Sequence, residues 1–171
     1  MTVAALCVGI VGTASAATVI AVRSGNDKQK AELRRAFKSP GPGPAGLAAS
    51  YSALADGKIH EGPQVAGADV TVHGSPIGGC ISVMSDGARS PGGSCFTEQD
   101  VTATTGLWNT VGDILVVLVP DAATDISVRT PDGVLRPATA ASNLVVAGRS
   151  DTVRYSVDGK EFTVAANGSV D

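Results

Sequence analysis

The stretch that decides the fold of this chain is residues 80–95, Cys80-Ile-Ser-Val-Met-Ser-Asp-Gly-Ala-Arg-Ser-Pro-Gly-Gly-Ser-Cys95. Its two cysteines bracket a strand-like run and a loop rich in Gly, Ser and Pro, whereas the third cysteine, Cys7, lies in the hydrophobic N-terminus. We predict a disulfide between Cys80 and Cys95. Because a persistent disulfide requires an oxidising compartment, this pair places the domain outside the cytoplasm. Closing about 15 residues in this way stabilises a fold by roughly 3 kcal/mol.

The composition of the 171-residue chain indicates a mainly β protein. It contains 21 Gly and 9 Pro, which suits many short strands joined by turns. Apolar residues make up 43% of the chain but aromatic residues only 4%, so we expect an aliphatic core in which Trp108 is a packing anchor. For residues 62–171 we predict a small antiparallel sandwich or barrel-like domain with one short helix.

The strands of this domain are predicted from apolar patterns and turn residues. The run Ile114-Leu-Val-Val-Leu-Val119 is typical of a strand covered on both faces, so we place it at the centre of the sheet. Pro131-Asp132-Gly133 and Asp158-Gly159 each follow an alternating run and predict hairpins. Further strands are expected within residues 65–72, 80–84, 126–129, 143–147 and 153–157, with a break at 74–79 and one or two helical turns within 97–105.

The N-terminal segment, residues 1–22, predicts a membrane anchor. Residues 3–22 carry no charged side chain, and about 20 apolar residues cross a bilayer as a helix. The alternative is a cleaved signal peptide, because Ala14-Ser15-Ala16 fits the small-residue cleavage pattern. In the anchor interpretation Cys7 is a small apolar residue of the span.

The cationic residues after this segment predict the opposite side of the membrane from the one that the cysteines predict. Residues 23–38 carry six cations against two anions, and the tendency of cationic flanks to stay inside would keep the domain in the cytoplasm. The cysteine pair argues for the opposite side, and we give it more weight. We therefore expect a single-pass protein of the cell membrane with its C-terminal domain outside the cytoplasm.

Residues 23–38 predict a basic juxtamembrane helix, in which Leu33 and Phe37 share one face. This helix either lies against anionic headgroups or forms a solvated stalk that continues the anchor. Residues 39–61 are expected to be a Pro/Gly linker that begins with Ser39-Pro-Gly-Pro-Gly-Pro and carries a short helix with Leu47, Tyr51 and Leu54 on one face.

The rest of the chain is acidic, with seven cations and fourteen anions outside residues 23–38. An acidic domain repels the phosphate backbone, so we expect no nucleic-acid partner. The basic stretch is better explained by a nearby membrane surface.

Four short motifs occur in this order: Gly79-Cys80-Ile-Ser-Val, Gly93-Ser-Cys95, Leu118-Val-Pro-Asp-Ala-Ala-Thr-Asp-Ile-Ser-Val-Arg-Thr-Pro-Asp-Gly133 and Asn143-Leu-Val. With the hydrophobic segment and the spacer, they resemble a group of uncharacterised actinobacterial exported or membrane-anchored β-domain proteins with a cysteine-pair loop. The likeness covers most of residues 60–147. It implies a topology and a compartment, and it supplies no catalytic residue because the group has no assigned activity.

The search for catalytic and metal-binding patterns yields few candidates. His60 and His73 are the only histidines, and a metal site there would need a third ligand such as Glu61 or Asp69; we favour two exposed loop histidines instead. Several aspartates lie near predicted turns, namely Asp121, Asp125, Asp132, Asp151 and Asp158. Their oxygens could bind calcium, but the preference of Asp for turns explains each of them without a metal. We therefore predict no catalytic residue, no bound metal and no cofactor.

These observations favour a membrane-tethered extracytoplasmic β domain with a binding, sensing or envelope-structural role and a protein or envelope partner of unknown identity. One alternative is an enzyme of unrecognised type that uses His60 or His73 as its base. Another is a single-pass signalling protein whose basic segment lies in the cytoplasm.

Overall fold

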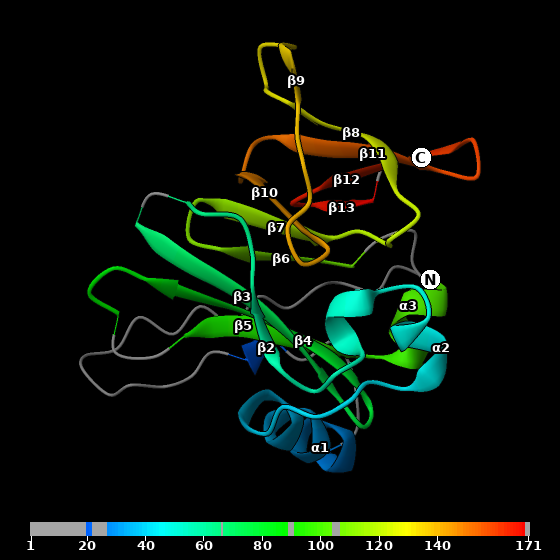
Figure 1. The fold of residues 1–171 in the computed structure, drawn as a ribbon. Helices are drawn as coiled ribbons and strands as arrows, with labels where there is room; N and C mark the ends of the chain where they lie inside the picture. Colours follow the sequence, from blue (N-terminus) through cyan, green and yellow to red (C-terminus); the bar gives the residue numbers. More distant parts are fainter. Residues whose placement is uncertain (1–19, 22–26, 66, 89–90, 104–106, 170–171) are drawn as a thin grey trace, which may run out of the picture.

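The computed structural model describes residues 20–21, 27–65, 67–88, 91–103 and 107–169, and it consists mainly of three stacked β-sheets (Figure 1). The lower sheet has the order β1-β5-β4-β3-β2, the middle sheet β10-β7-β6 and the upper sheet β13-β12-β11-β8-β9. The strands of the lower sheet are β1 (Ile20–Ala21), β2 (Ile59–Glu61), β3 (Ala68–Ser75), β4 (Gly78–Ser85) and β5 (Gly92–Thr97). Those of the middle sheet are β6 (Leu107–Val111), β7 (Ile114–Leu118) and β10 (Leu144–Gly148). Those of the upper sheet are β8 (Thr124–Arg129), β9 (Leu135–Pro137), β11 (Thr152–Val157), β12 (Lys160–Ala165) and β13 (Gly168–Ser169). The prediction of a mainly β fold is confirmed.

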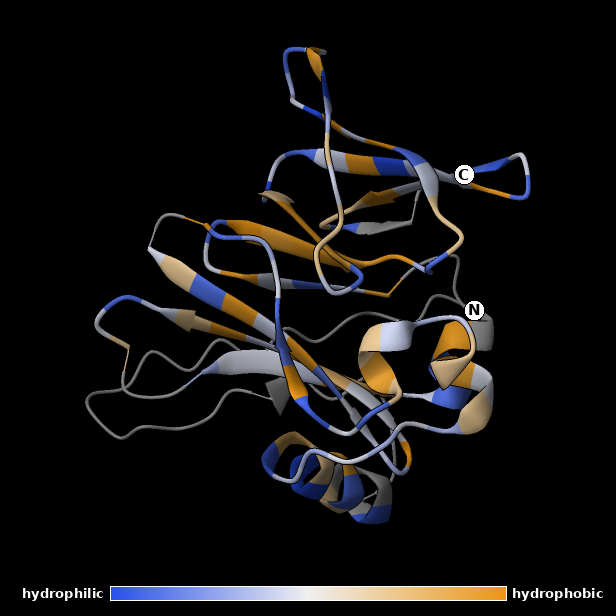
Figure 2. Ribbon diagram, viewed as in Figure 1, coloured by the Kyte–Doolittle hydropathy of each residue, from blue (hydrophilic) through white to orange (hydrophobic). Residues whose placement is uncertain are grey.

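Strand β7 explains why there are three layers. Its side chains alternate, so that Leu115 and Val117 lie in the core shared with the upper sheet, and Val116 and Leu118 in the core shared with the lower sheet. All four are fully buried, and each buried side chain of this kind contributes about 1.5–3 kcal/mol. Strands β7 and β10 of the middle sheet are accordingly almost continuously apolar along the ribbon in Figure 2. The prediction of a central strand covered on both faces is confirmed, and the sandwich has a third layer.

The hairpins of the upper sheet follow their predicted turns. Asp158 and Gly159 have φ angles of 51° and 76°, the left-handed pair that a tight two-residue turn between β11 and β12 requires. Across this hairpin Tyr155 stacks on Phe162 with ring centroids 5.4 Å apart. The β8–β9 hairpin likewise turns through Gly133, whose φ angle is 87°.

The predicted break at residues 74–79 is wrong. Strand β3 continues to Ser75 and β4 begins at Gly78, so only Pro76 and Ile77 form the turn. Gly74 permits this because a Cβ there would lie 2.2 Å from the carbonyl oxygen of Leu54. The glycines serve close backbone packing at this position and do not end the strands.

The helices are α1 (Asp27–Lys38), α2 (Ala45–Ala48), the 3₁₀ helix η1 (Ser52–Leu54) and α3 (Glu98–Ala103). The predicted basic helix and the predicted turns within 97–105 are therefore present. In α3, the backbone N–H and hydroxyl of Thr97 donate to Asp100 Oδ2 at 2.7 and 2.9 Å, which caps the first turn. The short helix expected between residues 46 and 57 is split into α2 and η1.

The predicted linker, residues 39–61, belongs to the packed domain. The N–H of Gly41 donates to Gly74 O at 3.0 Å and that of Gly43 to Leu54 O at 2.8 Å. The apolar side chains of α2 and η1 enter the lower core, and β2 pairs with β3. Because these residues bury apolar surface against the sheets, the packed domain extends N-terminally from residue 62 to α1.

The predicted anchor lies outside the described residues except at positions 20 and 21. These two residues form β1, which pairs in parallel with Gly93 and Ser94 of β5. Within the part of the chain that the structure describes, no helix has the length and apolar character needed to span a bilayer.

Candidate functional site

The predicted disulfide joins two directly opposed residues of neighbouring strands. Cys80 of β4 and Cys95 of β5 are register partners with Cα atoms 4.0 Å apart and an S–S distance of 2.06 Å. Their side chains are buried, Cys80 completely. Strand β4 continues to Ser85 and β5 begins at Gly92, so much of the stretch between the cysteines is strand rather than loop.

Helix α1 covers this disulfide. Leu33, Ala36 and Phe37 share one helical face and form a buried cluster with Cys80 and Cys95. The cationic side chains of α1 that the structure describes, by contrast, are exposed. The predicted solvated stalk is therefore wrong, and the apolar face that was a candidate for headgroup contact is already buried against the domain.

A glycine of the cysteine loop makes this packing possible. A Cβ at Gly93 would lie 2.7 Å from Phe37 Cε2 and 2.2 Å from the carbonyl oxygen of Ile81. The role of Gly93 is therefore to let the helix pack closely on the sheet, and not to make the chain flexible.

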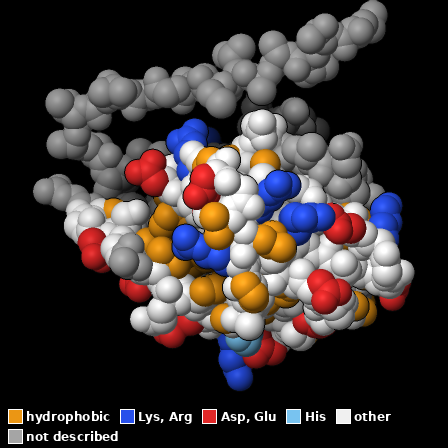
Figure 3. All heavy atoms as spheres, turned by 90° about the horizontal axis from the view of Figure 1, so that it is seen from above, with side chains coloured by type: hydrophobic (Ala, Val, Ile, Leu, Met, Phe, Trp, Pro, Cys, Tyr) orange, Lys and Arg blue, Asp and Glu red, His pale blue; other side chains and the backbone are white. Residues whose placement is uncertain are grey.

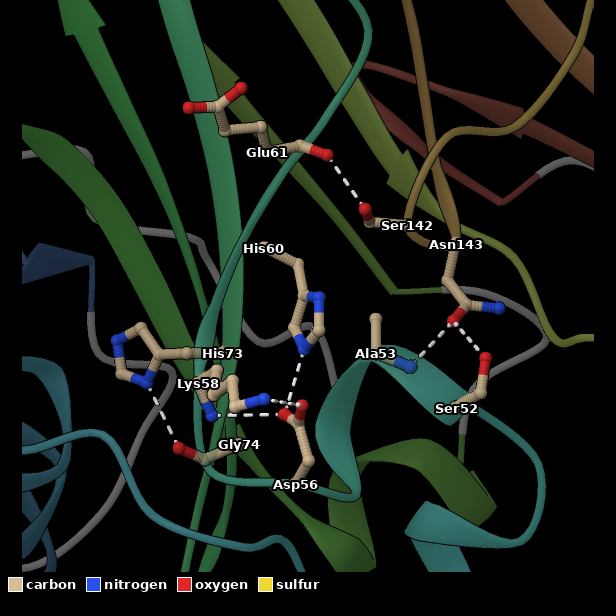
Figure 4. Close-up of polar contacts among 10 residues, drawn as sticks. All are labelled: Ser52, Ala53, Asp56, Lys58, His60, Glu61, His73, Gly74, Ser142 and Asn143. Atoms are coloured by element: carbon tan, nitrogen blue, oxygen red, sulfur yellow. Dashed lines mark hydrogen bonds and ion pairs between the residues drawn. The ribbon is translucent and has the colours of Figure 1, made fainter.

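The two histidines do not form one site. His73 lies in β3, is 2% exposed and donates from Nδ1 to Gly74 O at 2.9 Å, so the expectation that it is an exposed loop residue is wrong. His60 lies in β2 with its Nε2 2.8 Å from Asp56 Oδ1 (Figure 4). The pKa of Asp56 lies below its usual value, mainly because the backbone N–H of Lys58 donates to its carboxylate and, to a smaller extent, because the His60 side chain does.

The register of β2 and β3 keeps these histidines on different faces. His60 is opposite Val72, whereas His73 is opposite Ile59, and neighbouring strand residues point to opposite faces. Figure 4 shows the two rings directed to different sides of the ribbon. The suggested third ligands do not complete a site, because no group of three or more His, Cys, Asp or Glu side chains suited to a metal occurs among the described residues.

The acidic residues near turns have structural partners. Asp121 accepts from the N–H and hydroxyl of Ser52 at 3.0 and 2.9 Å and from Asn143 Nδ2 at 2.7 Å. Asn143 Oδ1 in turn accepts from the N–H of Ala53 at 3.0 Å. This polar cluster ties η1 to the end of β7 and to the turn before β10.

The other acidic residues also belong to turns. Asp151 Oδ2 accepts from the N–H of Gly148 at 2.9 Å, and Asp158 occupies the β11–β12 turn. Asp132 accepts from the Thr130 hydroxyl, which holds the pKa of Asp132 below its usual value. Asp125 has a φ angle of 52° at the irregularity between β8 and β11.

The outer face of the upper sheet has mixed character. Figure 3 looks onto it from above and shows cationic, anionic and apolar side chains interspersed. Its large exposed apolar residues are Val134 and Leu135, at the β8–β9 hairpin. Two side chains make too small a patch to indicate a docking surface.

A cavity of about 210 Å³ lies beside the disulfide, between α1, β5, α3 and β6. Leu33, Phe96 and Leu107 give it an apolar lining, while Asp100 and Asn109 add polar groups. None of its described lining residues is Lys, Arg or His. A small concave site with a few polar groups is typical of ligand pockets.

Asn109 is the unusual member of this lining. It is 7% exposed, and its Nδ2 has no hydrogen-bond partner in the described part of the chain. Its neighbour across the sheet, Val116, belongs to the lower core, so Asn109 lies on the same side of the middle sheet as Leu107 and Val111. A buried donor left unpaired costs about 1–3 kcal/mol.

This pocket was not predicted, although one signal for it exists in the sequence. In the run Leu107-Trp-Asn-Thr-Val111, Asn109 occupies an alternating position that its neighbours on that face fill with aliphatic residues. A polar residue in such a position indicates either a buried hydrogen bond or a site. Trp108 itself packs, half-buried, against the upper core, in agreement with its predicted role as a packing residue.

Comparisons of this chain with protein-family models, with curated proteins and with solved structures find no match.

Proposed function

We propose that this chain is an exported β domain, tethered to the cell membrane by a single N-terminal segment, that serves a binding role outside the cytoplasm. The observation that carries the proposal is the Cys80–Cys95 disulfide, which lies buried under α1. Disulfides persist in oxidising compartments and are rare in the cytosol. The disulfide therefore supports export of the domain, whereas the cationic residues after the hydrophobic segment favour its retention in the cytoplasm.

The tether proposed here is shorter than the hydrophobic segment. Since Ile20 and Ala21 belong to β1, the part of the hydrophobic segment 3–22 that precedes them is residues 3–19. Seventeen residues is the lower limit of a membrane-spanning helix, which typically needs about 17–25. Such a tether would place the domain directly on the membrane, with the exposed cations of α1 available to anionic groups at the envelope.

A second candidate, a secreted domain without an anchor, is favoured by the position of β1. Cleavage after Ala16 would leave a chain that begins at Ala17 and enters the sheet at Ile20. It would also explain why the apolar character continues beyond the cleavage pattern, because Ile20 and Ala21 belong to β1. The intact mass of the native protein separates the two candidates: a chain that contains residues 1–16 supports the anchor, and one that starts at Ala17 supports secretion.

The proposal is tested by labelling an engineered thiol on the exposed end of α1. Lys38 is exposed, and a Lys38→Cys variant with Cys7→Ser carries one added thiol besides the disulfide pair. We expect a membrane-impermeant maleimide to label it in intact cells, or in the medium if the domain is secreted. Labelling that appears only after lysis would contradict export. The Cys7→Ser protein with Lys38 intact controls for reaction at Cys80 and Cys95.

A further inference from the structure

The cavity beside the disulfide contains a buried donor that has no acceptor. Asn109 Nδ2 lines a space of about 210 Å³ without a described partner. Since more than nine-tenths of buried polar groups in proteins are hydrogen-bonded, such a group calls for an occupant that supplies an acceptor.

We propose that this cavity binds a small uncharged molecule that presents a carbonyl or hydroxyl oxygen to Asn109 and an aliphatic part to Leu33, Phe96 and Leu107. The inference rests on the binding role proposed above and names the class of ligand. It uses the domain alone, so it does not depend on how the chain is anchored.

The charges around the cavity select against an anion. The described lining residues include no Lys, Arg or His, so the lining offers no cationic side chain that would pair with an anionic ligand. An anionic ligand would lose its hydration and gain no counter-charge from this lining. A cation is also unsuited, because Asp100 already accepts from the N–H and hydroxyl of Thr97, and Asn109 Nδ2–H can bind only an acceptor atom.

The size of the cavity limits the ligand. A water molecule occupies about 30 Å³ in the liquid, so the space corresponds to about seven waters. This suits a compact molecule of roughly seven to ten non-hydrogen atoms. Ordered water alone is the competing occupant, and the experiment must exclude it.

The test uses three probes of one shape on the purified isotope-labelled domain. Pinacolone and pivalamide carry a tert-butyl group beside a carbonyl, and pivalate has the same shape with a negative charge. We expect millimolar pinacolone and pivalamide to shift the NMR signals of the Asn109 side-chain amide, Phe96 and Leu107. We expect pivalate to bind at least about tenfold more weakly, because its carboxylate would lose hydration without finding a cationic partner in the described lining.

The matched variants are Asn109→Leu and Asn167→Leu, the second at an exposed asparagine. Asn109→Leu should weaken pinacolone binding about five- to tenfold and leave the fold intact, while Asn167→Leu should change neither. The proposal is overturned if no uncharged probe shifts these signals, if pivalate binds as well as pinacolone, or if Asn109→Leu binds pinacolone unchanged. Should Asn109→Leu not fold, the wild-type shifts decide: shifts confined to the cavity support the site, and shifts elsewhere refute it. Failure here with successful surface labelling of Lys38→Cys would reject the pocket and keep the exported domain.

Discussion

Removal of the Cys80–Cys95 disulfide should destabilise the domain by about 3 kcal/mol. The bond closes a loop with a sequence separation of 15 residues, for which the loss of chain entropy in the unfolded state is worth about 3 kcal/mol. The native fold itself should persist, because the register of β4 and β5 is held by six residue pairs. Net stabilities of domains are about 5–15 kcal/mol, so the loss is large but tolerable.

Urea unfolding of the double variant Cys80→Ala/Cys95→Ala measures this effect. We expect a lower midpoint with a folded baseline that retains the β-sheet circular dichroism. A reducing agent should destabilise the wild type similarly and leave the double variant unchanged, and Cys7→Ser should unfold like the wild type. Equal midpoints for the wild type and the double variant would refute the reasoning.

Three further predictions concern packing, polar contacts and pH. Leu33→Ala should lower the free energy of unfolding by about 2–4 kcal/mol because Leu33 is 3% exposed against the disulfide, whereas the exposed control Arg34→Ala should leave it nearly unchanged in the same urea assay. Asn143→Ala should cost about 1–3 kcal/mol by thermal or urea unfolding, since it leaves the N–H of Ala53 buried and unpaired; an unchanged midpoint would contradict the structural role of the polar cluster. Burial, and to a smaller extent the electrostatic effect of Tyr51, raises the pKa of Tyr155 to about 12. The unfolded chain therefore loses the phenol proton of Tyr155 near pH 10, while the folded domain keeps it. Stability should therefore be fully present below about pH 10 and fall by about 2 kcal/mol as the pH rises toward about 12, and Tyr155→Phe should show a smaller fall.

The local elements could be predicted because their signals are local. The apolar run of β7 shows that both of its faces are covered, and the Asp158-Gly159 pair has the backbone preferences of its turn. The disulfide follows from two cysteines placed on either side of one hairpin.

The tertiary arrangement was harder to predict because periodicity does not identify a partner. The face of Leu33 and Phe37 was read correctly as one side of a helix, but nothing in its spacing distinguishes a membrane from a disulfide-bearing sheet. Gly41 and Gly43 similarly indicate the end of a helix. The hydrogen bond from Gly41 to Gly74 depends on a strand far along the chain, and that from Gly43 to Leu54 depends on the position of η1.

The candidate pocket combines residues from α1, β5, α3 and β6, which no motif connects. The signal at Asn109 is a single polar residue among the alternating apolar positions of one strand face. Only the burial of its side chain distinguishes it from a surface asparagine. His73 was misjudged for a related reason, because the glycines around it suggested a loop where the structure has a strand.

The most direct test of the proposed export is the oxidation state of the native cysteines. Cells are quenched with an alkylating reagent under denaturing conditions, and the protein is digested and mapped by mass spectrometry without reduction. The account predicts a linked peptide pair that contains Cys80 and Cys95, unmodified by the reagent. Alkylation of both cysteines in the native protein would contradict the disulfide in the cell and remove the main support for an extracytoplasmic domain.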